Sequence, residues 1–131
     1  MLTRVLGYAY DHHISVELHK EWSADWPSVS YPSHNLVVAN LNSVRSKEQT
    51  FMVAHEIGHV LNGDEDGLLY MSNSREKSEQ ERDADRTAIR VLLRLCQQED
   101  DYDATFFNSA QFMESLMIPA SYEGYVKSLV E

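Results

Sequence analysis

The stretch FMVAHEIGHVLNG, residues 51–63, places two histidines and a glutamate in a segment that is otherwise almost entirely apolar. Apolar residues would surround a helix of this sequence on nearly all sides, which indicates a central helix rather than a superficial one. Burying an ionisable side chain costs free energy unless a partner compensates for it. The partner of His55, Glu56 and His59 is therefore the first clue to what the chain does.

The spacing of these three residues indicates a metal site. On a helix, His55 and His59 lie about 40° apart on one face, one turn from each other. Two imidazoles in this arrangement can point a nitrogen each at one ion, as in many zinc sites. Glu56 lies about 100° around the helix, near enough to reach a water molecule on that ion, and this is the role of the general base in the H-E-x-x-H pattern. Gly58 would let another segment approach closely. A core histidine with satisfied hydrogen bonds is the alternative for either histidine taken alone.

A second helix, expected over about residues 78–97, offers the remaining ligand. On this helix Glu81 and Asp85 share a face with apolar residues, namely Ala88, Leu92 and Leu95. A buried carboxylate requires a cation, so Glu81 is the predicted third ligand. Asp85, one turn on, is placed to accept the free N–H of a ligand histidine and so to fix its ring. A solvated acidic patch is the alternative for this pair. The opposite face is expected to be solvated, and it carries Arg82, Arg86, Arg90 and Arg94.

The other elements predict an α+β fold in which strands come first and helices follow. Strands are expected at about residues 14–18, 29–31 and 36–41, and further helices at about 2–12, 104–117 and 119–130. Ser46 and Gln49 form a capping-box signature before the first ligand helix, and Gly63 suits its C-terminal cap. We expect a small N-terminal sheet, antiparallel or mixed, that packs on the H-E-x-x-H helix, with the second ligand helix and the C-terminal helices beside it.

Length and charge narrow the function. A chain of 131 residues fits a single domain, 1–131. Its net charge of −10 disfavours direct binding to nucleic acid or to anionic lipid. It has no apolar run long enough for a membrane-spanning helix and no recognisable secretory signal. A single cysteine, Cys96, excludes an internal disulfide and favours a reducing cytoplasm. We therefore expect a cytoplasmic protein.

Two segments together, VAHEIGHVLNG (53–63) and SEQERDADRTAIRVLL (78–93), resemble the ImmA/IrrE family of zinc metallopeptidases. The resemblance covers about residues 8–97. It implies a minimal zincin-like fold and a gluzincin-like site, with His55, His59 and Glu81 as zinc ligands, Glu56 as the base and Asp85 behind a ligand histidine. The short chain is similar to the phage or mobile-element members.

The resemblance also implies a substrate. Such proteins cleave a helix-turn-helix transcriptional repressor in the bacterial cytoplasm, which relieves repression of a prophage or a mobile element. A donor to the oxyanion of the tetrahedral intermediate is still needed. Tyr70 is a possible donor in the loop between the ligand helices, and Tyr31 and His34 are others.

Two other functions remain open. A zinc-stabilised antirepressor would bind the repressor without cleaving it, and it could do without Glu56. Direct DNA binding through residues 111–130, which loosely resemble a helix-turn-helix, is disfavoured because Lys127 is the only basic residue there. Zinc is expected because it suits two histidines and a carboxylate, although manganese or iron accepts the same ligands.

Overall fold

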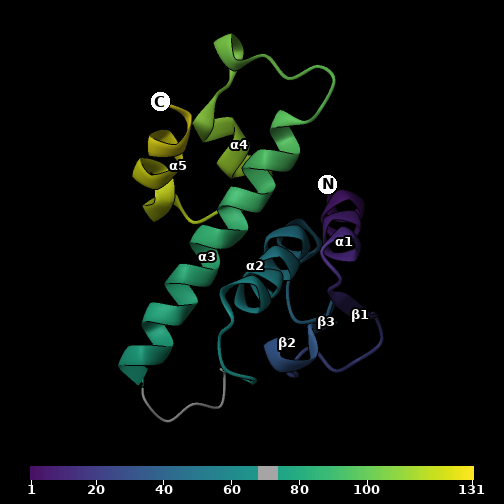
Figure 1. Cartoon of the computed structure of the whole chain (residues 1–131). Helices are drawn as coiled ribbons and strands as arrows, with labels where there is room; N and C mark the ends of the chain where they lie inside the picture. Colours follow the sequence, from purple (N-terminus) through teal and green to yellow (C-terminus); the bar gives the residue numbers. More distant parts are fainter. Residues whose placement is uncertain (68–73) are drawn as a thin grey trace.

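Five α-helices and a three-stranded sheet make up the part of the chain that the computed structural model describes, residues 1–67 and 74–131 (Figure 1). The fold is α+β, as the sequence predicts. In chain order the elements are α1 (Leu2–Asp11), β1 (Ser15–His19), β2 (Val29–Tyr31), β3 (Leu36–Asn40), α2 (Gln49–Asn62), α3 (Ser74–Gln97), α4 (Ser109–Ser115) and α5 (Glu123–Val130). Within those residues, no helix combines the length and the apolar composition that crossing a bilayer requires.

The sheet is mixed, with the strand order β1-β3-β2. β1 runs parallel to β3, and β2 runs antiparallel to β3. The middle strand, LVVAN, is the most apolar of the three, and its Val37 and Ala39 are fully buried. Both β2 and β3 contact α2, so the sheet packs against one side of the helix that carries His55 and His59.

α2 and α3 form the centre of the molecule and lie against each other in Figure 1. Gly58 explains how closely they approach, because a Cβ atom at this position would lie 2.6 Å from the backbone oxygen of Ala84. The expected close approach at Gly58 is therefore confirmed. Six fully buried residues fill the core around this contact, namely Val53, Ala54, Ile57, Ala88, Ile89 and Leu92.

The C-terminal helices α4 and α5 contact each other and lie beside the second half of α3 (Figure 1). A short 3-10 turn precedes each helix, at Ala104–Phe106 and at Ala120–Tyr122. Val126 of α5 is fully buried, and Phe112 of α4 is nearly so. These two side chains fix the C-terminal segment against the core.

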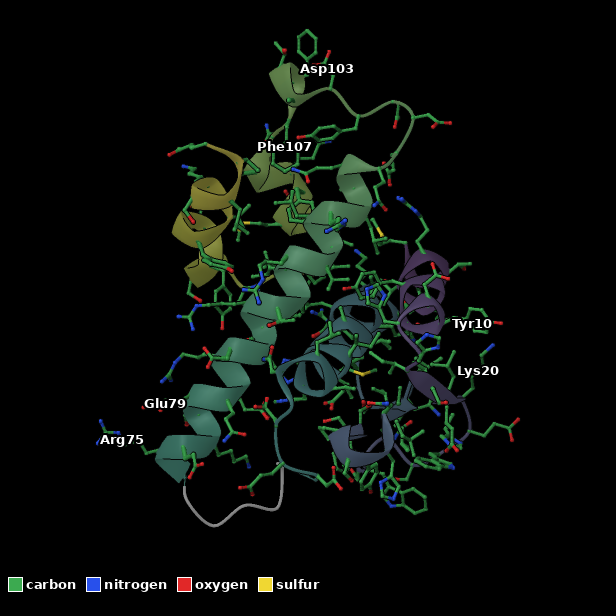
Figure 2. All side chains as sticks on the ribbon, viewed as in Figure 1. Tyr10, Lys20, Arg75, Glu79, Asp103 and Phe107 are labelled. Atoms are coloured by element: carbon green, nitrogen blue, oxygen red, sulfur yellow. The ribbon has the colours of Figure 1, made fainter. Side chains whose placement is uncertain are left out.

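Several expected boundaries are wrong. α3 begins at Ser74 rather than near residue 78, and Figure 2 shows Arg75, in this added turn, and Glu79 on the outside of the molecule. The two C-terminal helices are shorter than expected. α4 begins only after Asn108, whose side chain accepts a hydrogen bond from the backbone N–H of Gln111, and the chain leaves it through Met117 at a φ of 55°.

The start of α2 also differs from the prediction. Residues Ser46–Glu48 form a 3-10 turn, and neither this turn nor α2 has a side-chain cap at its N-terminus. The side chain of Gln49 instead donates to the backbone oxygen of Leu41 at 3.1 Å. The predicted capping box is therefore not formed. At the other end, Gly63 adopts the left-handed conformation, with a φ of 68°, and caps α2 as expected.

Candidate metal centre

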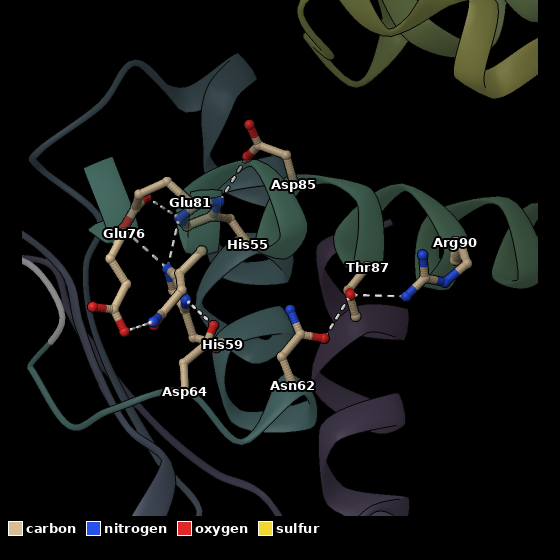
Figure 3. Close-up of polar contacts among 10 residues, drawn as sticks. His55, His59, Asn62, Asp64, Glu76, Glu81, Asp85, Thr87 and Arg90 are labelled. Atoms are coloured by element: carbon tan, nitrogen blue, oxygen red, sulfur yellow. Dashed lines mark hydrogen bonds and ion pairs between the residues drawn. The ribbon is translucent and has the colours of Figure 1, made fainter. Parts of the chain in front are cut away.

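Three side chains from the two central helices converge on one point (Figure 3). The Nε2 atoms of His55 and His59, both on α2, lie 3.1 Å apart. Glu81 on α3 approaches both rings, with its carboxylate oxygens 2.8 Å from His55 Nε2 and 3.2 Å from His59 Nε2. Each residue offers a ligand atom within 4.8 Å of the others, and this is the one such group of histidine, cysteine, aspartate or glutamate residues found in 1–67 and 74–131.

Helix geometry accounts for the convergence. His55 and His59 are one turn apart on α2, so both rings lie on the face that meets α3. Gly58 lies between them on the chain and brings the backbone of α3 close at Ala84. Glu81 lies three residues before Ala84 on α3, and Asp85 lies one residue after it. Both carboxylates are therefore close to the face of α2 that carries the histidines. The absence of a side chain at Gly58 thus allows the contact that assembles the group.

A carboxylate holds the outer nitrogen of each histidine. His55 Nδ1 lies 2.7 Å from Asp85 Oδ1, so the predicted contact of Asp85 with a ligand histidine is present. His59 Nδ1 lies 2.9 Å from Asp64 Oδ2. A proton held at Nδ1 by a carboxylate leaves the lone pair at Nε2 free for a metal ion and fixes the orientation of the ring.

Asp64 was not predicted from the sequence. The signal was present, because Asp64 follows Gly63, the residue expected to cap α2 in the left-handed conformation. Such a turn folds the chain back over the end of the helix, and the backbone N–H of Asp64 donates to the backbone oxygen of His59. The first side chain after the cap is therefore placed beside the last ligand of the helix.

The carboxylates favour positive charge where the two Nε2 atoms meet. Burial alone would lower the pKa of His55, but its hydrogen bonds with Asp85 and Glu81 outweigh burial and raise the pKa to about 10. Burial is likewise outweighed at His59, where Glu81 and Asp64 raise the pKa. Burial would raise the pKa of Glu81, but the two histidines hold it well below its usual range.

The donor set fits a divalent cation. When both Nδ1 atoms donate to carboxylates, two Nε2 lone pairs and a carboxylate point at the same position, and this arrangement needs a cation between them. Two imidazole nitrogens and a carboxylate oxygen are also the ligand types that zinc binds in catalytic sites, where one coordination position stays open.

Glu56 is half-buried on α2, next to the two histidines. Burial raises its pKa, and this effect exceeds the opposite influence of His55 and His59 and of a hydrogen bond with Ser30 of β2. A carboxylate with a raised pKa accepts a proton more readily near neutral pH. The geometry thus allows the predicted role of general base, which stays a prediction.

The candidate oxyanion donors gain no support. Tyr70 lies outside the described residues. Tyr31 ends β2, where it pairs with Leu36, and His34 Nδ1 lies 2.8 Å from the hydroxyl of Ser33. In the described part of the chain, neither side chain hydrogen-bonds to a member of the ligand group.

The arginine face of α3 is largely exposed, as expected, although it also makes contacts with the rest of the protein. Arg82, Arg90 and Arg94 are exposed and Arg86 is half-buried, and Arg90 donates to the hydroxyl of Tyr125 on α5 at 2.7 Å. Arg90 also donates to Thr87 at 2.9 Å, and the Thr87 hydroxyl donates to the side-chain oxygen of Asn62 at 2.7 Å (Figure 3). Part of this face therefore fastens α5 and the end of α2 to α3.

One protein-family model matches most of the chain. Residues 4–118 match the model of the family described as Peptidase U49, which spans the sheet and both ligand helices. Searches of curated proteins and of solved structures gave no match.

Proposed function

Because the chain belongs to the peptidase U49 family, we propose that it is a zinc-dependent endopeptidase of the gluzincin type. His55, His59 and Glu81 are the proposed ligands, and Glu56 is the proposed general base. One observation carries the proposal: three ligand atoms of the types zinc prefers lie within 4.8 Å of one another. The resemblance to the ImmA/IrrE family also supports it.

The chemistry divides between the ion and the chain. Bound zinc supplies a Lewis acid that polarises a peptide carbonyl and lowers the pKa of water. Glu56 accepts the proton of the attacking water and later gives it to the leaving amine. Asp85 and Asp64 hold the two imidazoles so that each Nε2 stays directed at the centre. His59 is almost fully buried, which keeps bulk water from one side of the site.

For the substrate, we propose a helix-turn-helix repressor whose cleavage in the cytoplasm relieves repression of a prophage or mobile element. The resemblance of the two ligand segments supports this assignment. Charge supports it as well, because a chain with a net charge of −10 complements a basic DNA-binding protein and repels DNA itself.

Glu56→Gln tests the enzyme proposal, because it removes the base while leaving every proposed ligand in place. We expect zinc content and thermal midpoint near wild type, while cleavage of the repressor encoded beside this gene falls by about 10²–10⁴-fold. Repressor binding should survive. Glu114→Gln on α4 is the matched control, since Glu114 is an exposed helical glutamate outside the site, and it should cleave like wild type.

The same experiment separates an enzyme from an antirepressor. A zinc-loaded wild-type protein that relieves repression no better than Glu56→Gln, with no repressor fragments from either, would contradict the peptidase proposal. The zinc-stabilised antirepressor would then be the better explanation, and the metal centre would be unaffected.

A further inference from the structure

We propose that Tyr122 is a positioning residue of the metal centre, which fixes Asp85 and, through Asp85, the ring of His55. The inference rests on the proposed function, because it concerns the same site. It adds a residue from the C-terminal segment to a site otherwise built on α2, the turn that follows it and α3. Tyr122 also lies beyond residue 118, where the family match ends.

Asp85 has one partner for each carboxylate oxygen. His55 Nδ1 lies 2.7 Å from Oδ1, and the hydroxyl of Tyr122 donates to Oδ2 at 2.6 Å. A carboxylate held at one oxygen can still rotate about its Cβ–Cγ bond, whereas two partners at separate oxygens define its plane. The tyrosine hydroxyl therefore restricts the group that orients the ligand ring.

The environment strengthens this contact. The side chains of Asp85 and Tyr122 are both half-buried, and a hydrogen bond to a carboxylate is stronger where water is partly excluded. Burial and the Asp85 carboxylate raise the pKa of Tyr122 to about 12, so the hydroxyl keeps its proton and remains a donor at neutral pH.

Backbone structure holds Tyr122 in place. It is the last residue of the turn Ala120–Tyr122, and its backbone N–H donates to the oxygen of Pro119 at 3.0 Å. α5 follows directly and is anchored by Val126, which is fully buried. The hydroxyl thus reaches Asp85 from a segment with its own attachment to the core, as a positioning role requires.

Tyr125, in α5, provides a matched control from the same C-terminal segment. It is also half-buried, and its hydroxyl also makes one hydrogen bond to α3, accepting from Arg90 at 2.7 Å. Arg90 contacts none of the three ligand side chains through the hydrogen bonds that the described residues show. Tyr122→Phe and Tyr125→Phe therefore remove the same atom and differ in whether it leads to the metal centre.

The test measures zinc affinity by competition with a chromophoric chelator. Tyr122→Phe should weaken zinc binding by about three- to tenfold, less than the roughly 10- to 100-fold expected from losing a direct partner of a ligand histidine, because Tyr122 acts through Asp85. Tyr125→Phe should match wild type within about twofold. Visible absorption of Co²⁺ bound in place of zinc should change in Tyr122→Phe alone, and thermal midpoints of the chelator-treated proteins report any general loss of stability.

A double variant shows whether Tyr122 acts through Asp85. In an Asp85→Ala background, Tyr122→Phe should cost no further zinc affinity, because the two changes interrupt the same path. An equal loss in both backgrounds would overturn the inference, as would a Tyr122→Phe protein that binds zinc like Tyr125→Phe. Wild-type protein that binds no zinc would overturn the proposed function and the inference together, so the two failures are distinguishable.

Discussion

His55 and His59 lie one turn apart on the same helix, yet the chain supports them in different ways (Figure 3). His59 is held by Asp64, five residues later, across the turn that ends α2. His55 is held by Asp85 of α3, 30 residues away, and Asp85 in turn by Tyr122, another 37 residues on. One ligand is oriented by local structure and the other by the docking of two further segments.

Burial follows the same division. The side chain of His59 is 2% exposed, and that of His55 is 16% exposed. The locally supported ligand is thus the deeper one, while the more open ligand depends on packing between helices. A change that loosens the packing of α3 on α2 should therefore disturb the His55 side of the site first.

The largest effect is expected from removing a ligand. His55→Ala, His59→Ala and Glu81→Ala should each lose the one zinc ion that we expect per chain, because two remaining ligands rarely retain it. Elemental analysis after gel filtration measures this, with exposed Glu79→Ala on α3 as the control. Full zinc content in one histidine variant would show that this histidine is not a zinc ligand.

The second-largest effect is expected from removing the metal ion. Zinc binds only where α2 and α3 are docked, so a chelator should lower the thermal midpoint. With free zinc about a thousandfold above its dissociation constant, the stabilisation amounts to about 4 kcal/mol. Differential scanning calorimetry with and without the chelator measures the shift, and His55→Ala should show none. Equal midpoints for wild type would mean that the ion does not tie the helices together.

Gly58→Ala tests the contact between the helices directly. The added methyl group would meet the Ala84 backbone oxygen, so α2 and α3 must move apart, at a cost of about 1–3 kcal/mol in the free energy of unfolding. Gly7→Ala in α1 is the control, because its Cβ meets nothing within 4 Å, and it should be neutral or stabilising by up to about 1 kcal/mol. Denaturant unfolding curves compare them. Equal stability of the two variants would remove the close approach as an explanation for the site.

The smallest effect is the difference between the two supporting carboxylates. Asp85→Ala and Asp64→Ala should each weaken zinc binding by about 10- to 100-fold. Asp85→Ala should cost about 1 kcal/mol more in unfolding free energy, because it leaves the Tyr122 hydroxyl as well as a histidine Nδ1 without a partner. Chelator competition and denaturant unfolding measure the two quantities. A larger loss of stability in Asp64→Ala would reverse the comparison.

The difference between local and long-range support also explains which site residues could be predicted from the sequence. Helical periodicity alone places His55 beside His59 and Glu81 beside Asp85, so both pairs could be predicted without a structure. Asp64 was missed although the Gly63 turn pointed to it. Tyr122 could not be found, since no periodicity relates a residue in a C-terminal turn to one 37 positions earlier.

The sheet shows the same limit. All three strands lie close to where alternation and branched residues predict them. Their order, with β3 in the middle and parallel to β1, depends on pairings between distant segments and needed the structure. The capping box failed for a different reason: the side chain of Gln49 bonds to Leu41 instead, so a tertiary contact replaced a local one.

The long-range support of His55 has a consequence for folding kinetics. A chain in which α3 has not yet docked presents an oriented His59 but a His55 without its carboxylate, so a complete metal centre exists only once the fold is nearly formed. An interaction that is absent from the transition state slows unfolding and leaves the folding rate almost unchanged. Bound zinc should therefore act on this protein mainly by lengthening the lifetime of the folded state, which would slow irreversible thermal inactivation.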